Sequence, residues 1–335
     1  MAGRPLPESW ASEGSAIRRA IVADFAAVEG VQVIETVDAR CLDERLESKK
    51  STRIVADSGP VDLGALGKLA DASIVVAPES DGELARLARL VERSGGRSLG
   101  STPEAIALCS DKLRLARHFA EVGVPTPPTR VFSPGSGLPQ VDSPSGRVVI
   151  KPVDGAGSVD TFVLEASSPR PPELSRRSVA LIQPFRPGRS LSASFLVGLD
   201  GQVRLLAVGS QQVEVARRGE VRYLGGEVPI PFPDIALAPV RKAVESVPGL
   251  LGFVGVDFLD SVEGLEVLEI NPRLTTSIVG LVRLAPPGTI ARAWLSLAFG
   301  PGGGEPGTEL EVICSAPPVR FRADGSILGT GEAGV

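Results

Sequence analysis

The stretch 252–273 constrains the fold of this chain more than any other part of it. It contains two apolar runs of strand character joined by a short turn around Gly264. Asp257 lies in the first run, and Glu269 and Asn271 end the second. Because alternate residues of a strand point to the same face, a hairpin can bring these three oxygen-bearing side chains together.

Three oxygen ligands without His or Cys favour a hard cation, and Mg²⁺ in particular binds through a few carboxylates together with substrate phosphates. The alternative interpretation is a surface hairpin whose acids are simply solvated. Here the acids stand inside apolar runs that we expect to be buried, and Arg273 follows two positions later. We therefore interpret Asp257, Glu269 and Asn271 as a predicted metal site.

Composition excludes several classes of protein. With 335 residues, of which 43% are hydrophobic, the chain is expected to be globular and to hold two or three domains. A net charge of −5 gives no basic footprint for a nucleic-acid partner. No signal peptide and no membrane-spanning run are recognised in the sequence, so no membrane association is expected.

Cysteine and histidine usage narrows the chemistry. Cys41, Cys109 and Cys314 lie far apart, which predicts free thiols in a reduced, cytoplasmic setting. His118 is the single histidine and falls in a helical pattern, where a surface or packing role is favoured over catalysis. Catalysis by a His triad or by zinc is therefore disfavoured.

The first hundred residues alternate helix and strand patterns, which predicts a parallel α/β layer. We expect a helix capped by Ser12 that stops at Gly30, strands at 31–37, 53–57 and 73–78, and a helix at 81–93. The segment has no GxGxxG pattern, so a structural role beside the substrate is favoured over dinucleotide binding.

The middle of the chain carries a lysine in a suggestive context. Lys151 ends a predicted strand at 148–152, and Gly155 and Gly157 follow it. Glycines let backbone N–H groups approach phosphate oxygens, and an ammonium neutralises phosphate charge. The pattern is weak by itself, and no Walker loop is present.

The remaining elements are assigned by pattern alone. The sequence predicts a helix capped at Thr102, a helix at 110–123, a strand at 129–132, a loop at 133–146, a strand at 178–185, a hairpin of 191–199 with 203–215, an irregular glycine-bearing segment at 222–229, helices at 235–247, 277–284 and 289–299, a linker at 301–307 and two terminal strands within 310–328.

Four motifs in order resemble the ATP-grasp superfamily over roughly residues 102–299. They are Asp111-Lys112 followed by Gly-Val-Pro-Thr-Pro, Val-Ile-Lys151-Pro with its glycine loop, Ile-Gln183-Pro-Phe-Arg-Pro-Gly188, and Asp257 with Glu269-Ile-Asn271-Pro-Arg273. The resemblance implies a parallel α/β pre-ATP-grasp domain (1–101), an ATP-grasp N-subdomain (102–182), a C-subdomain (183–300), and a linker with terminal strands (301–335).

The resemblance also implies roles for individual residues toward ATP and Mg²⁺. Lys112 and Lys151 would contact phosphates; Gly155, Gly157 and Ser158 would cover them; Gln183, Phe185 and Arg186 would form the adenine hinge; and Asp257, Glu269 and Asn271 would hold one or two Mg²⁺ ions, or Mn²⁺. Two positions depart from the family pattern. Ser190 stands where many relatives place an acid on the ribose, and Pro184 removes one hinge N–H.

The segment Asn-Pro-Arg-Leu-Thr-Thr-Ser and the segment Tyr223-Leu-Gly-Gly look most like the tyramine–glutamate ligases of methanofuran biosynthesis. That resemblance implies an ADP-forming ligase that joins the γ-carboxylate of glutamate to tyramine or a related amine through an acyl phosphate. A homodimer is one possible assembly. Lys151 and Arg273 would be catalytic, and Arg273 would bind the acyl phosphate or the carboxylate.

Several alternatives stay open. Arg273 can instead form a structural ion pair, and Thr275, Thr276 and Ser277 can contact substrate or cap the following helix. The enzyme can be a dipeptide ligase for another amino-acid pair. It can also be a nucleotide-binding protein that has lost catalysis, although two lysines and three metal ligands together argue against that.

Overall fold

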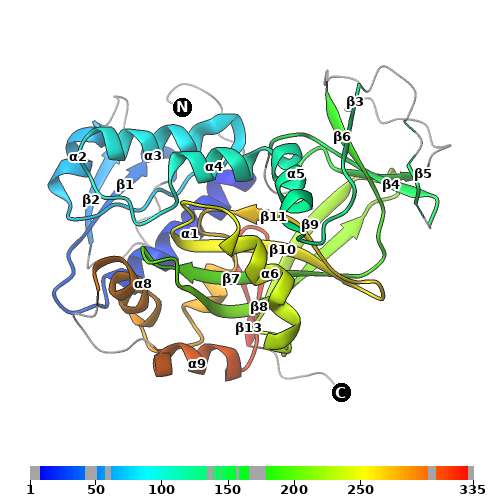
Figure 1. Ribbon diagram of the computed structural model, residues 1–335. Helices are drawn as coiled ribbons and strands as arrows, with labels where there is room; N and C mark the ends of the chain where they lie inside the picture. The colour runs from blue at the N-terminus through cyan, green and yellow to red at the C-terminus, as the bar shows by residue number, and fades with distance from the viewer. Residues whose placement is uncertain are drawn as a thin grey trace.

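The computed structural model describes residues 8–41, 51–56, 62–133, 139, 141–143, 145–155, 158–165, 179–300 and 307–330. In this part of the chain the strands form a two-stranded, a four-stranded and a seven-stranded sheet. Figure 1 shows the small sheet and its helices at one end of the molecule, the four-stranded sheet at the other, and the large sheet between them. No helix in these ranges is long and apolar enough to cross a membrane.

The N-terminal region contains the parallel α/β layer predicted from the sequence. Its elements are α1 (Glu8–Phe25), β1 (Val33–Asp38), η1 (Ala39–Cys41), β2 (Ser51–Ala56), α2 (Leu63–Leu69), η2 (Ser80–Gly82) and α3 (Glu83–Arg93). β1 and β2 pair in parallel. Two details of the prediction were wrong. α1 begins at Glu8, so Ser12 lies inside the helix and does not cap it, and the run 73–78 forms only an isolated parallel bridge between Ser73 and Ser98.

The next region carries two helices and the four-stranded sheet, whose order is β3-β6-β4-β5. The elements are α4 (Pro103–Ser110), α5 (Lys112–Val122), β3 (Arg130–Phe132), β4 (Arg147–Lys151), β5 (Phe162–Glu165) and β6 (Ala180–Pro184). Thr102 caps α4 as predicted, since its side chain accepts from the Ala105 N–H. Asp111 caps α5, and Gly123 ends it in the left-handed conformation. Much of the predicted loop at 133–146 lies outside the described residues.

The seven-stranded sheet has the order β11-β10-β7-β8-β9-β12-β13. Its strands are β7 (Arg189–Val197), β8 (Val203–Val215), β9 (Val221–Val228), β10 (Gly252–Ser261), β11 (Gly264–Asn271), β12 (Val319–Arg322) and β13 (Ile327–Thr330), and its helices are η4 (Asp234–Leu237), α6 (Ala238–Glu245), α7 (Ile278–Leu281), α8 (Thr289–Phe299) and α9 (Gly307–Ser315). The predicted hairpin of 191–199 with 203–215 is confirmed as β7 and β8.

Two predictions fail in this sheet. Most of the segment 222–229 lies in strand β9, which pairs with β12 and, across one register shift, with β8, because its two glycines permit a close approach of β12 that any side chain would block. The terminal segment begins with the helix α9 before its two predicted strands. Leu310 and Ile313, three positions apart, are both buried in α9, which is helical spacing.

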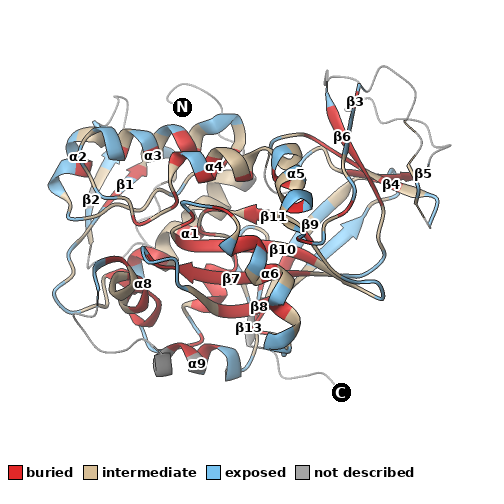
Figure 2. Ribbon diagram, viewed as in Figure 1, coloured by how far each residue is buried: buried red, intermediate tan, exposed pale blue. Residues whose placement is uncertain are grey.

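Apolar residues cover both faces of the large sheet. Neighbours on β10, such as Phe253 and Val254, belong to different core clusters because successive side chains point to opposite faces. One cluster joins the sheet to α1, α7, α8 and α9, and the other joins it to α4, α5 and α6. Figure 2 shows the central strands buried with helices on either side. This double cover makes the large sheet a rigid base for the side chains that line the site.

Candidate active site

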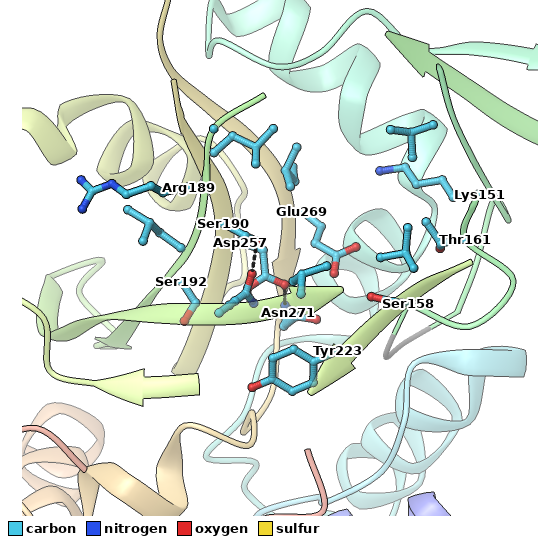
Figure 3. Close-up of a pocket in the computed structure, with 18 of the residues that line it drawn as sticks. Lys151, Ser158, Thr161, Arg189, Ser190, Ser192, Tyr223, Asp257, Glu269 and Asn271 are labelled. Carbon is cyan, nitrogen blue, oxygen red and sulfur yellow. Dashed lines mark hydrogen bonds between the residues drawn. The ribbon is translucent and has the colours of Figure 1, made fainter. Parts of the chain in front are cut away.

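The hairpin of β10 and β11 places the predicted metal ligands side by side. Asp257 and Glu269 are register partners, and a bulge at Leu268 follows them. Partners in register lie on the same face of a sheet, and Asn271, two positions after Glu269, shares that face. The Asn271 Nδ2 atom donates to Asp257 Oδ2 at 3.1 Å. Figure 3 shows the three side chains facing one space.

Two lysines, one from helix α5 and one from strand β4 of the four-stranded sheet, reach this cluster. Lys112 is the first residue of α5, and its ammonium forms an ion pair with Glu269. Lys151 ends β4 and is buried. Burial lowers the pKa of Lys151 to about 8, and the charge of Lys112 adds to this effect. Burial also acts to lower the pKa of Lys112, but the neighbouring carboxylates, Glu269 first, outweigh it and raise the value.

The two carboxylates have opposite pKa shifts. Burial and the adjacent charge of Glu269 raise the pKa of Asp257 to about 8. Burial would raise the pKa of Glu269 as well, but the charges of Lys112 and Lys151 outweigh it and lower the value to about 2. Paired carboxylates in a buried site push their ionisations apart in this way.

The donor set fits Mg²⁺ on its chemistry. Asp257, Glu269 and Asn271 offer two carboxylates and one amide oxygen, with no nitrogen or sulfur ligand beside them. In the described ranges no group of three or more His, Cys, Asp or Glu residues is placed to hold a metal. A cation here would therefore depend on the Asn271 amide and on phosphate oxygens for its remaining ligands.

The glycine loop lies at the mouth of the same cavity. Gly155 has φ of 126°, and Ser158 has φ of 60°, a left-handed conformation that few residues other than glycine adopt. Both residues line the cavity. Gly157, the second glycine of the predicted loop, lies outside the described residues.

The predicted adenine hinge follows β6. The side chain of Gln183 turns away to donate to Thr129 Oγ1 at 2.7 Å. The Phe185 N–H donates to the Arg147 carbonyl at 2.9 Å, and the Arg147 guanidinium lies over the Phe185 ring, 4.4 Å from its centroid. Arg186 forms an ion pair with Glu263, with an N–O distance of 3.0 Å.

Ser190 leads to a residue that sequence reasoning missed. Its hydroxyl donates to Gln211 Oε1 at 2.7 Å, and Gln211 Nε2 donates to Asp257 Oδ1 at 2.8 Å. Gln211 thus fixes one oxygen of Asp257, while Asn271 holds the other. Gln211 lies in the polar half of β8, between Ser210 and Gln212, so its local sequence gave no signal.

Arg273 forms an ion pair, which was one of the two roles that the sequence left open for it. Its Nε atom lies 2.7 Å from Glu79 Oε2, and both side chains are largely buried. Arg273 also lines the cavity, so an ion pair and a substrate contact are compatible. Glu79 comes from the N-terminal region, and nothing in its local sequence marked it.

The three hydroxyls after Arg273 bond to side chains. Ser277 lies 2.8 Å from Thr275 Oγ1 and 3.1 Å from Ser194 Oγ, and it makes no side-chain capping bond to α7. The Thr276 hydroxyl donates to Glu13 of α1. Capping of the following helix is therefore wrong for Ser277. Glu13 is a third residue, after Gln211 and Glu79, that the sequence did not reveal.

Most of these side chains line one cavity of about 900 Å³ between the two larger sheets. The residues predicted from sequence that the cavity contains are Lys112, Lys151, Gly155, Ser158, Gln183, Phe185, Arg186, Ser190, Asp257, Glu269, Asn271, Arg273, Thr275, Thr276 and Ser277. Glu13, Gln211, Tyr223 and Phe321 join them from outside the predicted set.

Comparison with known proteins shows which family the chain matches. Residues 31–106 match the pre ATP-grasp 3 domain, and residues 109–277, half of the chain, match the ATP-grasp domain. A structure of a putative ATP-grasp superfamily protein from Archaeoglobus fulgidus is 25% identical, covers 96% of this chain and 89% of its own, and superposes with a TM-score of 0.68.

Two curated relatives are ligases. The tyramine–L-glutamate ligase of Methanocaldococcus jannaschii is 32% identical over 213 residues, which are 63% of this chain and 58% of that protein. The D-alanine–D-alanine ligase of Acidiphilium cryptum is 28% identical over 64% of this chain and 74% of its own length. The lysines, the oxygen cluster and the family match agree: the chain belongs to the ATP-grasp family.

Proposed function

We propose that this protein is an ATP-dependent ligase that joins a carboxylate to an amine and releases ADP and phosphate. The observation that carries the proposal is the convergence of Lys112, Lys151 and the Asp257–Glu269–Asn271 cluster in one cavity, with Arg273 on its wall. Two lysine ammonium groups facing an oxygen cluster suit a nucleoside triphosphate with its metal ion. The ligase names of the relatives support the same activity.

ATP would lie between the four-stranded and seven-stranded sheets. Lys112 and Lys151 would contact its phosphates, and backbone N–H groups of the loop from Gly155 to Ser158 would cover them. At the hinge, Pro184 has no N–H and that of Phe185 is already bonded. Gln183 is the register partner of Val149 in the β4–β6 ladder, so the adenine edge would use the backbone that follows, at Arg186.

Asp257, Glu269 and Asn271 would hold Mg²⁺. When bound, the ion would offset the negative charge of the phosphates. Gln211 would keep Asp257 oriented through the bond between its amide and Oδ1. Ser190, which stands where many relatives place an acid on the ribose, already donates its hydroxyl to Gln211, so it would contact the ribose only as an acceptor.

A carboxylate is a poor acyl donor because its leaving group would be oxide. In the proposed reaction a carboxylate oxygen attacks the γ-phosphorus, the bond to the β–γ bridging oxygen breaks, and ADP leaves. The amine nitrogen then attacks the acyl carbon, the bond to the phosphate oxygen breaks, and the nitrogen loses a proton. The lysines offset the charge that moves with the phosphoryl group, and the planar fork of Arg273 suits the acyl phosphate or the carboxylate.

For the substrates we propose the γ-carboxylate of glutamate and tyramine or a related amine. The relative from Methanocaldococcus jannaschii supports this pair by its name. A ligase for another amino-acid pair is the second candidate, which the D-alanine–D-alanine ligase relative favours. The match to the first relative covers 58% of that protein, so its substrates come to this chain only as a proposal.

The test is ADP formation by the purified protein with Mg²⁺ and pairs drawn from a panel of acids and amines, with products identified by mass spectrometry. We expect ADP release that requires an acid and a γ-glutamyl amide when glutamate and tyramine are present. Turnover with D-alanine alone would favour the second candidate. ATP binding without ADP release under any pairing would contradict the ligase proposal.

A further inference from the structure

The cavity has an end that the proposed ATP and metal contacts do not use. It is formed by Glu13 of α1, Tyr223 of β9, Thr276 before α7 and Phe321 of β12. Figure 3 shows the Tyr223 ring beside Asn271, away from Lys151 and Arg189. Burial raises the pKa of Tyr223, and the charges of Asp257 and Glu13 add to this effect, so the phenol lies within electrostatic reach of both the oxygen cluster and Glu13.

Phe321 reaches this end because the C-terminal strand pair extends the large sheet. β12 pairs with β9, and Phe321 stands opposite Gly226. β12 lies beyond the segment 109–277 that matches the ATP-grasp domain, so this wall of the cavity is supplied from outside the matched domain.

The glycine pair after Tyr223 makes that docking possible. A Cβ at Gly225 would lie 2.0 Å from the Phe321 carbonyl oxygen, and its φ is 136°. A Cβ at Gly226 would lie 2.5 Å from the Ser210 oxygen and 3.1 Å from Phe321 Cζ. Side chains at these positions would push β12 off the sheet. The Tyr-Leu-Gly-Gly segment therefore supplies one aromatic wall and admits the other.

Charge at this end is negative. Glu13 lines it and accepts a hydrogen bond from Thr276. Arg273 is the nearby cation among the described cavity residues, and it is paired with Glu79. The other cations among the described cavity residues lie elsewhere. Lys112 and Lys151 are at the oxygen cluster, where Lys112 pairs with Glu269. Arg186 and Arg189 are at the hinge, where they pair with Glu263 and Asp260. Arg273 is paired with Glu79 and is assigned to the carboxyl group that is activated, so a second ligand carboxylate at this end would meet Glu13 with no further cation to balance it, whereas an ammonium would be attracted.

We propose that this end is the subsite for the amine substrate, and that it selects a primary amine with a flat apolar body and no carboxylate. Phe321 and Tyr223 contact the apolar body, and Glu13 binds the ammonium before the amine reacts. The inference rests on the proposed ligase function and deepens it. It separates an aryl-alkylamine such as tyramine from an amino-acid acceptor such as tyrosine or D-alanine, which carries a carboxylate.

The experiment compares the wild-type protein with Phe321→Leu and Glu13→Gln, which change the ring and the charge with little change in volume. We expect Phe321→Leu to raise the KM for tyramine at least about tenfold, the range in which a changed apolar contact discriminates. Glu13→Gln should raise it by a similar factor because the charge that attracts the ammonium is lost. The KM for ATP should change less than about twofold in both. Wild type should use tyrosine at least a hundredfold less well than tyramine, and Glu13→Gln should narrow that ratio. Arg320→Ala is the matched control, because Arg320 precedes Phe321 on β12 and pairs with Glu227 of β9 at the protein surface.

Two further measurements keep the inference apart from the ligase proposal. Hydroxylamine is a small nucleophile that needs no subsite, so glutamyl hydroxamate formed with ATP reports carboxyl activation alone. Calorimetric titration of tyramine reports the subsite without turnover, and thermal melting of each variant shows that it is folded. Hydroxamate formation together with unchanged tyramine affinity in both folded variants would overturn the subsite and leave the ligase proposal standing.

If wild type formed no hydroxamate and no ADP, the ligase proposal would fail, and tyramine titration would still decide the subsite. A tenfold weaker titration in Phe321→Leu and Glu13→Gln, with Arg320→Ala unchanged, would support it. A rise in the KM for glutamate but not for tyramine in Glu13→Gln would contradict the role given to Glu13.

Discussion

The matched ATP-grasp segment and the two ends of the chain contribute to the same cavity in different ways. Within 109–277 the site residues come in short motifs on strands, and their spacing brings them together. From outside it, Glu13 and Phe321 line the cavity and Glu79 pairs with the cavity residue Arg273, each without a sequence motif of its own. Glu13 meets Thr276 across 263 positions of sequence. The comparison indicates that the reactive centre is encoded locally, whereas the walls around it are supplied by tertiary packing.

The largest expected effect comes from breaking the ion pair between Glu79 of the N-terminal region and Arg273 of the matched segment. Glu79→Ala leaves the buried guanidinium of Arg273 without its partner, and losing one member of a buried ion pair costs about 3–5 kcal/mol. Urea unfolding monitored by circular dichroism measures the loss. Glu83→Ala removes a neighbouring but exposed pair with Arg86 and should cost less than about 1 kcal/mol. Equal losses in the two variants would show that the Glu79–Arg273 pair is not a structural link.

The next effect tests the matched segment. Lys151→Ala or Glu269→Ala removes one charged group from the site and should lower turnover at least about a hundredfold, the cost of one lost electrostatic donor. The assay is ADP release with saturating glutamate and tyramine. Lys242→Ala removes a surface lysine that donates to the Gly123 carbonyl and should turn over normally. A near-native rate for Lys151→Ala would remove the role given to that lysine.

The sequence was sufficient for the parts of the fold in which local pattern and packing agree. The hairpin of β10 and β11 follows from alternation and a glycine turn, and α4 and α5 follow from their caps. The same approach failed at β9, because glycines usually weaken strands and the strand that requires them, β12, lies almost a hundred positions away by its register with Phe321.

Candidate site residues divide in the same way. Asp257, Glu269 and Asn271 were found because two positions on one strand share a face. Gln211 was missed because its bond to Asp257 depends on how β7 separates β8 from β10, which no local spacing records. Sheet order, rather than strand pattern, is what sequence reasoning lacked here.

Replacing Gln211 should have a smaller effect, which is confined to the binding of Mg²⁺. Gln211→Leu removes the amide that holds Asp257, and loss of such an orienting partner should raise the Mg²⁺ concentration needed for half-maximal activity about 10–100-fold. Titration of the ADP assay with Mg²⁺ measures it. Gln212→Leu alters the exposed neighbour on the opposite face of β8 and serves as the control. The same Mg²⁺ requirement in both variants would contradict an orienting role.

The pH dependence gives the mildest effect. Because burial lowers the pKa of Lys151 to about 8, the ammonium loses its proton as the pH rises through 8, well below the ordinary lysine value. Above that point, at Mg²⁺ concentrations high enough to keep Asp257 ionised, kcat/KM for ATP should fall, approaching about tenfold per pH unit, since this ratio reports the free enzyme. Lys151→Arg keeps its charge in this range and should lack the descending limb. A wild-type profile that stays flat to pH 9.5 would contradict the assignment.

The most direct test of the central claim, activation of a carboxyl group by the γ-phosphate of ATP, follows an oxygen atom. Glutamate labelled with ¹⁸O in its γ-carboxylate is turned over with ATP and tyramine, and the released phosphate is examined by ³¹P nuclear magnetic resonance. Transfer through an acyl phosphate predicts one labelled oxygen in each phosphate formed. Phosphate that carries no label, released together with amide product, would contradict the account.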